Sequence, residues 1–354
     1  MNKFYLSKEK STMIKGIAII LMIAHHLFAF PERILEPSEY FSIPIFDNSI
    51  AYYIGVFSRI CVGIYLFLSG YGLYIKYSNE KNFKWILKKI KSFLVNYWLV
   101  IGLVFIPLGI ILGKYNISIK ELILNATCIK ISFITSWWFV RIYIELLLIF
   151  PIIIKLSKIS LFNNIVTFVI IPIIFTKMRI DLNFISNPLL NVIYEITTYI
   201  PLIGNGVIFA KFDLFSKFNM VENKINLDKV LVNLFILIIV FIIRTIKPGL
   251  FYMDLLFVPF FIYSTINLIN LNCFIRVKTV LLYLGVNSTN LWLIHDILIE
   301  KYFQKLVYYP KLDTIVLIWV FILILPFSVG INKLMKHINS IKFKNTNRSL
   351  IKIK

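Results

Sequence analysis

Ten apolar runs, each long enough to cross the hydrocarbon core of a bilayer, constrain this 354-residue chain more than any other feature. They cover approximately residues 12–30, 50–77, 92–112, 135–155, 161–177, 190–210, 229–246, 251–272, 280–303 and 313–335. Hydrophobic residues make up 59% of the chain, more than a soluble domain of this length buries. In hydrocarbon every backbone amide and carbonyl needs a hydrogen-bond partner within the protein. Runs of this length satisfy that need by forming helices. We therefore predict an all-α, polytopic integral membrane helix bundle with about ten transmembrane helices.

The distribution of basic residues predicts the orientation of these helices. The chain carries 38 Lys and Arg against 17 Asp and Glu, a net charge of +21. With both termini in the cytoplasm, about 25 of the basic residues fall on the cytoplasmic side and about 10 outside, as the positive-inside rule requires. We therefore predict a membrane domain over residues 1–335 and a basic cytoplasmic tail over 336–354. Topology accounts for most of this charge, so a nucleic-acid partner is not expected.

The first run places two ionisable residues on one helix face. Lys15 and His26 are eleven residues apart, close to three full turns, whereas His25 is rotated by about 100° from that line. His26 lies roughly 16 Å deeper than Lys15, near the middle of the bilayer. An imidazole, with an unperturbed pKa of about 6.5, suits proton transfer, which makes His26 the first candidate catalytic residue. The alternative, a neutral histidine bonded to a neighbouring helix, fits His25 better.

The second run combines one cation with small residues. Arg59 lies within it, and Ser69-Gly70-Tyr71 follows ten residues later. Small side chains permit close approach of a ligand or of another helix, so a helix-packing seam is the alternative interpretation. As functional residues, Arg59, Tyr71 and the Ser69-Gly70 backbone are candidates to stabilise an oxyanion or to contact an acyl donor.

The loop after the second run is strongly basic. Lys88 and Lys91 are three residues apart and therefore share a helix face at the predicted cytoplasmic surface. They are candidates to bind a phosphorylated donor. Attraction to anionic lipid is the equally ordinary alternative.

Two later runs carry further candidates. In the fourth run, Trp138 fits an interfacial aromatic belt, and Arg141 and Glu145 have the i, i+4 spacing of a pair that neutralises itself. In the ninth run, Ser288 and His295 are functional candidates, with interhelical hydrogen bonding as the alternative.

Other polar residues remain unassigned at this stage. The sequence alone assigns no partners to three further charged residues in or near the runs, Glu195, Arg244 and Asp254. The cysteines Cys61, Cys128 and Cys273 lie far apart without metal-ligand spacing, so we predict buried small side chains and no disulfide or metal site.

Taken in order, these segments resemble the acyltransferase 3 family of bacterial membrane proteins. Members transfer acyl groups, usually acetyl, from a cytoplasmic acyl-CoA to cell-surface glycans or their precursors. The resemblance covers roughly residues 10–335, and the matching positions are Lys15-Gly16 with His26, Tyr65 to Tyr71, Lys88 with Lys91, Trp138-Phe139, and Ser288 to His295. It implies a multi-pass protein of the bacterial cytoplasmic membrane, acetyl-CoA as co-substrate without a metal, and a glycan or lipid-linked sugar as acceptor.

The chain departs from the family pattern at several positions. Lys15, Lys88 and Lys91 stand where arginines are usual, and lysine lacks the bidentate fork of arginine, so donor affinity is expected to differ. Trp292 stands where tyrosine is common. Some members carry an extra extracytoplasmic esterase-like domain, which is not expected here. The chain then either completes the transfer itself or passes the acyl group to a separate glycan-assembly protein.

The resemblance implies an O-acyltransferase in which the phosphates of acetyl-CoA lie near Lys15, Lys88 and Lys91 and the thioester reaches His26. His26 acts as a general base or forms an acyl-histidine, and the sequence leaves both open. The main alternative is a transporter or flippase for a lipid-linked sugar, because charges and prolines within helices also mark transport paths. A glycan polymerase, expected to have a large external loop, and transfer of succinyl or another acyl group are further alternatives.

Overall fold

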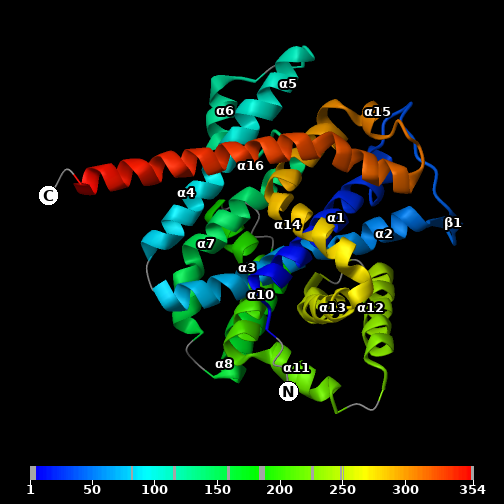
Figure 1. The fold of residues 1–354 in the computed structure, drawn as a ribbon, viewed down its shortest axis with the longest axis vertical. Coiled ribbons are helices and arrows are strands. Elements are labelled where there is room, and N and C mark those ends of the chain that lie inside the picture. Colours follow the sequence, from blue (N-terminus) through cyan, green and yellow to red (C-terminus); the bar gives the residue numbers. More distant parts are fainter. Residues whose placement is uncertain are drawn as a thin grey trace. The chain divides into compact units, whose positions relative to one another are not determined.

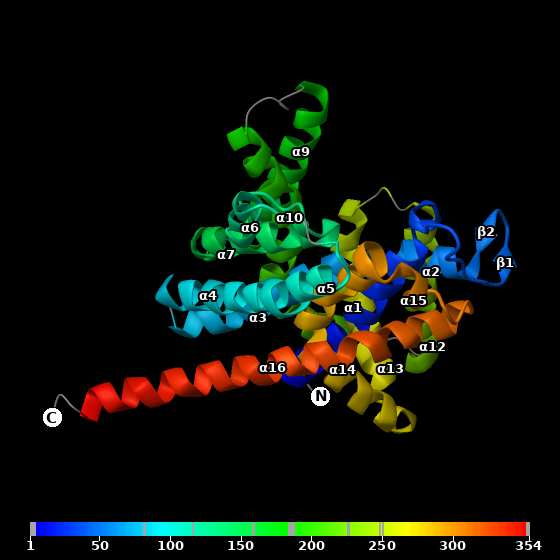
Figure 2. The ribbon, with the colours of Figure 1, turned by 90° about the horizontal axis from the view of Figure 1, so that it is seen from above.

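The structure is a computed structural model that describes residues 5–80, 83–114, 117–157, 160–182, 188–224, 227–247, 249 and 251–351. These residues are almost entirely helical (Figures 1 and 2), and the strands among them form one short antiparallel pair, β1 (Pro44–Ile45) and β2 (Asn48–Ser49). The predicted all-α class is confirmed. The chain divides into two compact units: unit 1 comprises Met1–Ala29, Pro44–Ile90 and Trp138–Val286, and unit 2 comprises Phe30–Ile43, Lys91–Trp137 and Asn287–Lys354.

Unit 1 holds most of the helices. In chain order they are α1 (Lys8–Phe28), α2 (Ile50–Ser58), α3 (Ile60–Glu80), α7 (Trp138–Leu156), α8 (Leu161–Ile165), α9 (Ile171–Leu182), α10 (Pro188–Phe212), α11 (Leu214–Glu222), α12 (Lys229–Ile246) and α13 (Asp254–Ile269). A π-helical segment, Val166–Ile170, joins α8 to α9, and short 3₁₀ segments, Phe251–Met253 and Asn272–Phe274, flank α13. Side chains of Ser7, Ser49 and Asp228 accept hydrogen bonds from first-turn amides and so begin α1, α2 and α12.

Unit 2 is built around the ends of two helices that begin in unit 1, α4 (Phe83–Val100) and α14 (Ile275–Asp296). Its other elements are the 3₁₀ segments Pro31–Arg33 and Thr135–Trp137, the π-helical segments Ile101–Phe105 and Ile297–Tyr302, and the helices α5 (Ile106–Ile111), α6 (Ile119–Ala126), α15 (Gln304–Val307) and α16 (Asp313–Ile351). The α16 helix is long and uninterrupted in both views (Figures 1 and 2).

Among the described residues, six helical stretches are long and apolar enough to cross a membrane. They are Lys8–Phe28, Ile50–Tyr77, Phe83–Ile111, Val192–Phe212, Lys229–Ile246 and Asp313–Ser340. Described helices also cover the four remaining predicted runs, but Leu161–Lys177 and Asp254–Ile269 are shorter, and α7 and α14 carry polar and charged side chains. The structure therefore supports a multi-pass membrane protein, whereas the count of ten and the side of the termini stay predictions.

The helices accommodate the prolines of the apolar runs in two ways. Pro151, Pro201 and Pro259 lie inside continuous helices, α7, α10 and α13. Pro107 and Pro172 each follow a π-helical segment by two residues. Proline removes an amide donor and crowds the preceding turn, and a wider turn nearby relieves that crowding. The apolar runs thus remain helical through their prolines.

Glycines set two close helix contacts in unit 1. A Cβ at Gly70 of α3 would collide with the carbonyl oxygen of Ile203 on α10, and one at Gly206 of α10 would collide with that of Phe67 on α3. The same reciprocal arrangement joins Gly16 of α1 to α14 and Gly285 of α14 to α1. Membrane helices gain van der Waals contact through small residues of this kind, because lipid supplies no hydrophobic drive between them. The alternative interpretation of Gly70, a packing seam, describes its position in the structure.

Unit 2 is held together by a chain of buried amides. Asn96 of α4 donates to Asn290 of α14 over 2.6 Å, Asn290 donates to Asn332 of α16 over 2.9 Å, and Asn332 donates back to Asn287 of α14 over 2.7 Å. Each amide has both donor and acceptor groups, so a chain of this kind satisfies several buried polar atoms at once. These bonds join three helices in one register.

Contacts between connecting segments bear on the predicted topology. In unit 2 the segment after the first run meets the end of the ninth run and the segment that follows it: Arg33 pairs with Glu300 at 3.2 Å, and Lys311 pairs with Glu39 at 2.7 Å. In unit 1 Lys211, at the end of α10, donates to the carbonyl of Ser157, just after α7. Segments in contact lie on one side of a membrane, so an even number of crossings separates each pair. The ten-span topology has that property.

The predicted boundary at residue 335 is not marked by a break. The α16 helix runs without interruption from Asp313 to Ile351, while residues 352–354 lie outside the described part of the chain. Its apolar portion, Asp313–Ser340, is one of the six candidate spans. The assignment of residues 336–354 to a cytoplasmic tail stays a prediction.

Candidate active site

The functional face predicted for the first run lies on α1 in unit 1. Lys15 and His26 belong to one unbroken helix, so about 16 Å along the helix axis separates them. Both side chains are half-buried. The backbone carbonyl of Lys15 accepts a hydrogen bond from the Tyr65 hydroxyl of α3 at 3.3 Å. The neighbouring α3 is therefore attached beside the Lys15 end of α1.

His25 has the structural role that was its alternative interpretation. Its Nδ1 lies 2.8 Å from the carbonyl oxygen of Gly55, where a Cβ would meet the backbone of Phe28 and Ala29. A carbonyl oxygen only accepts, so Nδ1 of His25 carries the hydrogen. The His25 and His26 rings meet edge to face with centroids 5.5 Å apart. His25 thus links α1 to α2 by a hydrogen bond and packs against the ring of His26.

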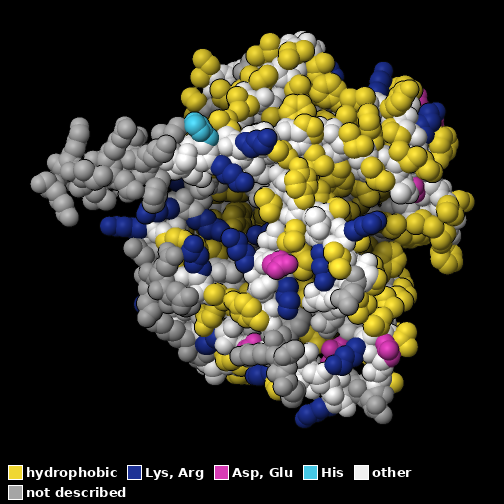
Figure 3. All heavy atoms as spheres, in the orientation of Figure 1, with side chains coloured by type: hydrophobic (Ala, Val, Ile, Leu, Met, Phe, Trp, Pro, Cys, Tyr) yellow, Lys and Arg dark blue, Asp and Glu magenta, His cyan; other side chains and the backbone are white. Residues whose placement is uncertain are grey.

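A basic and aromatic cluster surrounds the Lys15 end of α1. Lys89 of α4 and Tyr143 of α7 both lie within electrostatic range of the Lys15 ammonium group. Lys89 also approaches the ring of Trp85, with its ammonium 5.9 Å from the centroid, and Lys76 of α3 lies 5.4 Å from the same ring. An aromatic ring between cations favours an anionic ligand with a flat group beside it. Lys and Arg side chains also far outnumber Asp and Glu on the face drawn in Figure 3.

The two lysines chosen from the sequence differ in position from Lys89. Lys88 and Lys91 are both exposed on α4, whereas Lys89 is half-buried and is the residue near Lys15. Lys88 and Lys91 do share a helix face, but helix spacing cannot say which face of α4 meets α1. Lys89, Lys76 and Trp85 are further basic and aromatic residues in this part of unit 1 that the sequence did not single out.

The Ser69-Gly70-Tyr71 segment is largely committed to packing. Gly70 faces the α10 backbone, as described above, and Ser69 is half-buried. Tyr71 is 6% exposed, stacks on Phe67 and hydrogen-bonds through its hydroxyl to the backbone of Leu6. In this structure the segment joins α3 to α10 and to the start of the chain.

Arg59 lies where α2 meets α3, in a different environment. Its side chain is exposed, and its guanidinium lies within electrostatic range of His25, Asp254 and Tyr199. Two of the three charges to which the sequence assigned no partner, Arg244 and Asp254, pair with each other, with Nε and Oδ1 2.8 Å apart and both side chains fully buried. Arg59 therefore lies near the His25 end of α1, and Arg244 is the direct partner of Asp254.

The α7 helix presents a second polar face toward α10. The predicted pair of Arg141 and Glu145 forms at 3.1 Å, and Arg141 also pairs with Glu195, whose partner the sequence did not assign. Trp138, one turn before Arg141, stacks on Tyr199 of α10 with centroids 5.3 Å apart. Aromatic rings and carboxylates from two helices therefore meet on one side of α7.

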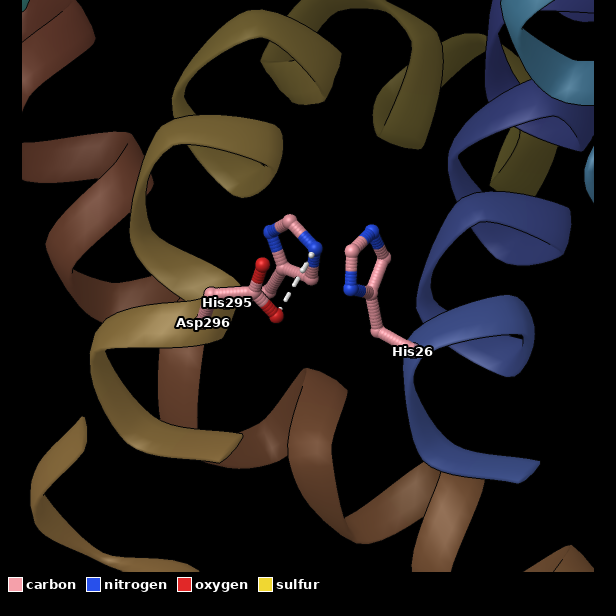
Figure 4. A group of neighbouring side chains, drawn as sticks. All are labelled: His26, His295 and Asp296. Carbon is pink, nitrogen blue, oxygen red and sulfur yellow. Dashed lines mark ion pairs between the residues drawn. The ribbon is translucent and has the colours of Figure 1, made fainter. Parts of the chain in front are cut away.

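Unit 2 contains the late candidates on α14. His295 and Asp296 are fully buried, with Nε2 of His295 3.3 Å from Oδ1 of Asp296, the contact dashed in Figure 4. Nδ1 of His295 lies 2.5 Å from the Trp292 carbonyl oxygen and therefore carries a hydrogen. Ser288 is buried two turns earlier on the same helix. In the sequence, the signal for Asp296 is that it directly follows His295 within the ninth apolar run.

Of the cysteines, two have the predicted environment. Cys61 and Cys128 are buried, whereas Cys273 is exposed in the segment between α13 and α14. The prediction of a buried side chain was therefore wrong for Cys273, because a three-residue 3₁₀ segment carries it outside the helix packing.

Together these features define a multi-pass helical membrane protein with a histidine in the last turn of α1, basic residues toward the other end of that helix and polar faces on neighbouring helices. The chain belongs to the acyltransferase 3 family: the family model, described as an acyltransferase domain, matches residues 11–333. No curated protein and no solved structure matches it. The family resemblance is thereby confirmed over nearly the whole chain, and the transporter alternative receives no support.

Proposed function

We propose that the protein transfers an acetyl group, or a related acyl group, from cytoplasmic acyl-CoA to a hydroxyl of a cell-surface polysaccharide or lipid-linked sugar. The observation that carries the proposal is the arrangement along α1, which places His26 about 16 Å of helix from a cluster of Lys15, Lys89 and Trp85. Cations and an aromatic ring suit the phosphates and base of a nucleotide-containing donor. Family membership supports the reaction class.

In the proposed reaction His26 removes the proton from the acceptor hydroxyl as the oxygen attacks the thioester carbonyl carbon. The tetrahedral intermediate collapses, the carbon–sulfur bond breaks, and the departing CoA thiolate takes the proton from the imidazolium. The products are an ester and free CoA thiol. Arg59 is the candidate to stabilise the oxyanion, because its guanidinium lies within electrostatic range of the adjacent His25.

Thiol release tests the proposal. Membranes containing wild type, His26→Ala, His25→Asn or the exposed-residue control His337→Ala are incubated with acetyl-CoA and a cell-envelope glycan extract. We expect His26→Ala to lower thiol release and glycan O-acylation by about 10²–10⁴-fold, the usual contribution of a general base, and His337→Ala to behave as wild type. His25→Asn, which keeps a donor for Gly55, should retain most activity. Equal activity of His26→Ala and wild type would refute the role of His26.

The variant with a covalent intermediate is separable from direct transfer. When radiolabelled acetyl-CoA is supplied without acceptor, an acyl-histidine predicts hydroxylamine-sensitive label on wild type and none on His26→Ala. Direct transfer predicts no label on either protein. The two mechanisms share every other outcome of the thiol assay.

A further inference from the structure

The stacked rings of Trp138 and Tyr199 are more exposed than the rings of a contact that only packs two helices together. Their centroids are 5.3 Å apart with planes inclined by 29°, yet Trp138 is 37% exposed, whereas the preceding residue, Trp137, is fully buried. Tyr199 is half-buried on α10. An interfacial tryptophan normally presents its ring to lipid headgroups, but this one lies over a second aromatic ring and beside charged groups.

Those charged groups are also open to a ligand. Glu195 precedes Tyr199 by one turn of α10, and Glu145 follows Trp138 by two turns of α7, with Arg141 paired to both carboxylates. Side-chain exposure is 40% for Glu195, 28% for Arg141 and 16% for Glu145. The purely structural pair of unit 1, Arg244 and Asp254, is by contrast 0% exposed on both sides. The α7–α10 cluster is thus accessible in a way that a sealed ion pair is not.

This combination matches the chemistry of a sugar ring. A pyranose presents an apolar C–H face, which packs on an aromatic ring. Its rim carries hydroxyl groups, whose hydrogen bonds carboxylate oxygens accept. The guanidinium of Arg141 supplies donors for ring or hydroxyl oxygens. The cluster has two carboxyl groups and one guanidinium, so it can both accept hydrogen bonds from a sugar and donate to it.

The cluster also adjoins the proposed reaction centre within unit 1. Tyr199 lies within electrostatic range of both Glu195 and Arg59, and Arg59 is in turn within range of His25, the neighbour of His26. These interactions link Tyr199, on which Trp138 stacks, to the group that we propose to stabilise the oxyanion. The donor cluster at Lys15 occupies the other end of α1.

We propose that Trp138, Tyr199, Glu195 and Arg141 form the acceptor subsite, and that it binds a sugar ring with free hydroxyls. The inference rests on the proposed function, because it assigns the acceptor of that reaction. Trp138, Glu195 and Arg141 bind substrate directly, and Arg141 also holds the two carboxylates together.

Two separate readouts test the subsite. Purified protein in detergent is titrated with acetyl-CoA in a thermal-shift assay, and membranes are assayed for acyl transfer to graded doses of base-deacylated cell-envelope glycan extract. Trp138→Ala and Glu195→Gln should each raise the glycan dose for half-maximal transfer about tenfold and leave the acetyl-CoA dependence unchanged. The matched control is Trp98→Ala, since Trp98 is also an exposed helix tryptophan, 46% exposed, outside the subsite. Periodate oxidation of the extract, which cleaves vicinal diols, should abolish acceptance.

Several outcomes would overturn the subsite. One is an unchanged glycan dose in both variants, and others are an equal shift in Trp98→Ala, a parallel loss of acetyl-CoA binding, or full acceptance of oxidised extract. If either variant fails to fold, Trp138→Phe and Glu195→Asp replace it, with smaller shifts expected in the same direction. If wild type transfers no acyl group to any extract, the proposed function itself fails, a result distinct from a variant-specific null.

Discussion

Arg244 and Asp254 show what a charge inside this protein requires. Both side chains are fully buried, and the guanidinium meets the carboxylate through two atom pairs, at 2.8 and 3.5 Å. Loss of one partner from such a pair typically costs about 3–5 kcal/mol because the other charge stays buried without compensation. The pair holds α12 against α13, and the open cluster on α7 has no comparable enclosure.

The position of Lys89 leads to a prediction at the residue scale. Replacing Lys89 by Gln should raise the KM for acetyl-CoA about tenfold, since Lys89 lies near Lys15 and the Trp85 ring. Lys88→Gln and Lys91→Gln are the matched controls on the same helix, and their exposed charges should change KM by about twofold or less. Steady-state kinetics on membranes measure all three. A larger effect at Lys88 or Lys91 than at Lys89 would favour the sequence-based choice of donor residues.

At the scale of elements, close helix packing depends on a few backbone positions. The α3–α10 contact has reciprocal glycines, Gly70 and Gly206, each facing a carbonyl of the other helix. A main-chain carbonyl cannot rotate away as a side chain can, so added volume must separate the helices. The segment that resembles the family motif at Ser69-Gly70 therefore bears on stability as well as on any contact with substrate.

Gly70→Ala should destabilise the protein by about 1–3 kcal/mol, the usual cost of overpacking, because its Cβ would meet the Ile203 carbonyl. Gly72 lies two residues further along α3 with nothing within 4 Å of an added Cβ. Gly72→Ala should therefore be neutral or stabilising by about 0.5–1 kcal/mol, through helix propensity. Thermal unfolding in detergent compares the two variants. Equal stability of both would show that α3 and α10 separate without cost.

At the scale of the whole molecule, the main question is topology. Contacts of Arg33 with Glu300 and of Lys311 with Glu39 place two connecting segments of unit 2 together, as expected if both are extracytoplasmic. The Lys211 contact with Ser157 does the same for two connections of unit 1 predicted to be cytoplasmic. These contacts require an even number of membrane crossings between the paired segments. Which side is cytoplasmic is inferred from the distribution of basic residues.

Thiol labelling can decide the orientation. Cys273 is exposed, and the ten-span topology puts it in a cytoplasmic segment, so an impermeant maleimide should label it only after the membrane is opened. In a Cys273→Ser background, Tyr309→Cys should be labelled in intact cells, because Tyr309 is 78% exposed in a segment predicted to be outside. The buried cysteines Cys61 and Cys128 should react little in either preparation. The reverse pattern would require inverted topology, and labelling of both sites from one side would require an odd change in the number of spans.

The sequence by itself determined the all-α membrane class, the helical runs and the family, because each depends on local apolarity or on the order of short motifs. The shared face of Lys15 and His26 and the pairing of Arg141 with Glu145 also followed from helix spacing alone.

Only the tertiary structure decided which helix faces meet. It selected Lys89 over Lys88 beside Lys15, paired Arg244 with Asp254, and brought Glu195 and Tyr199 of α10 to the face of α7 that carries Trp138. A helix period fixes the directions of side chains relative to one axis and leaves the rotation of that axis against its neighbours open. In this protein that rotation is set by glycine contacts and buried polar bonds between residues far apart in the chain.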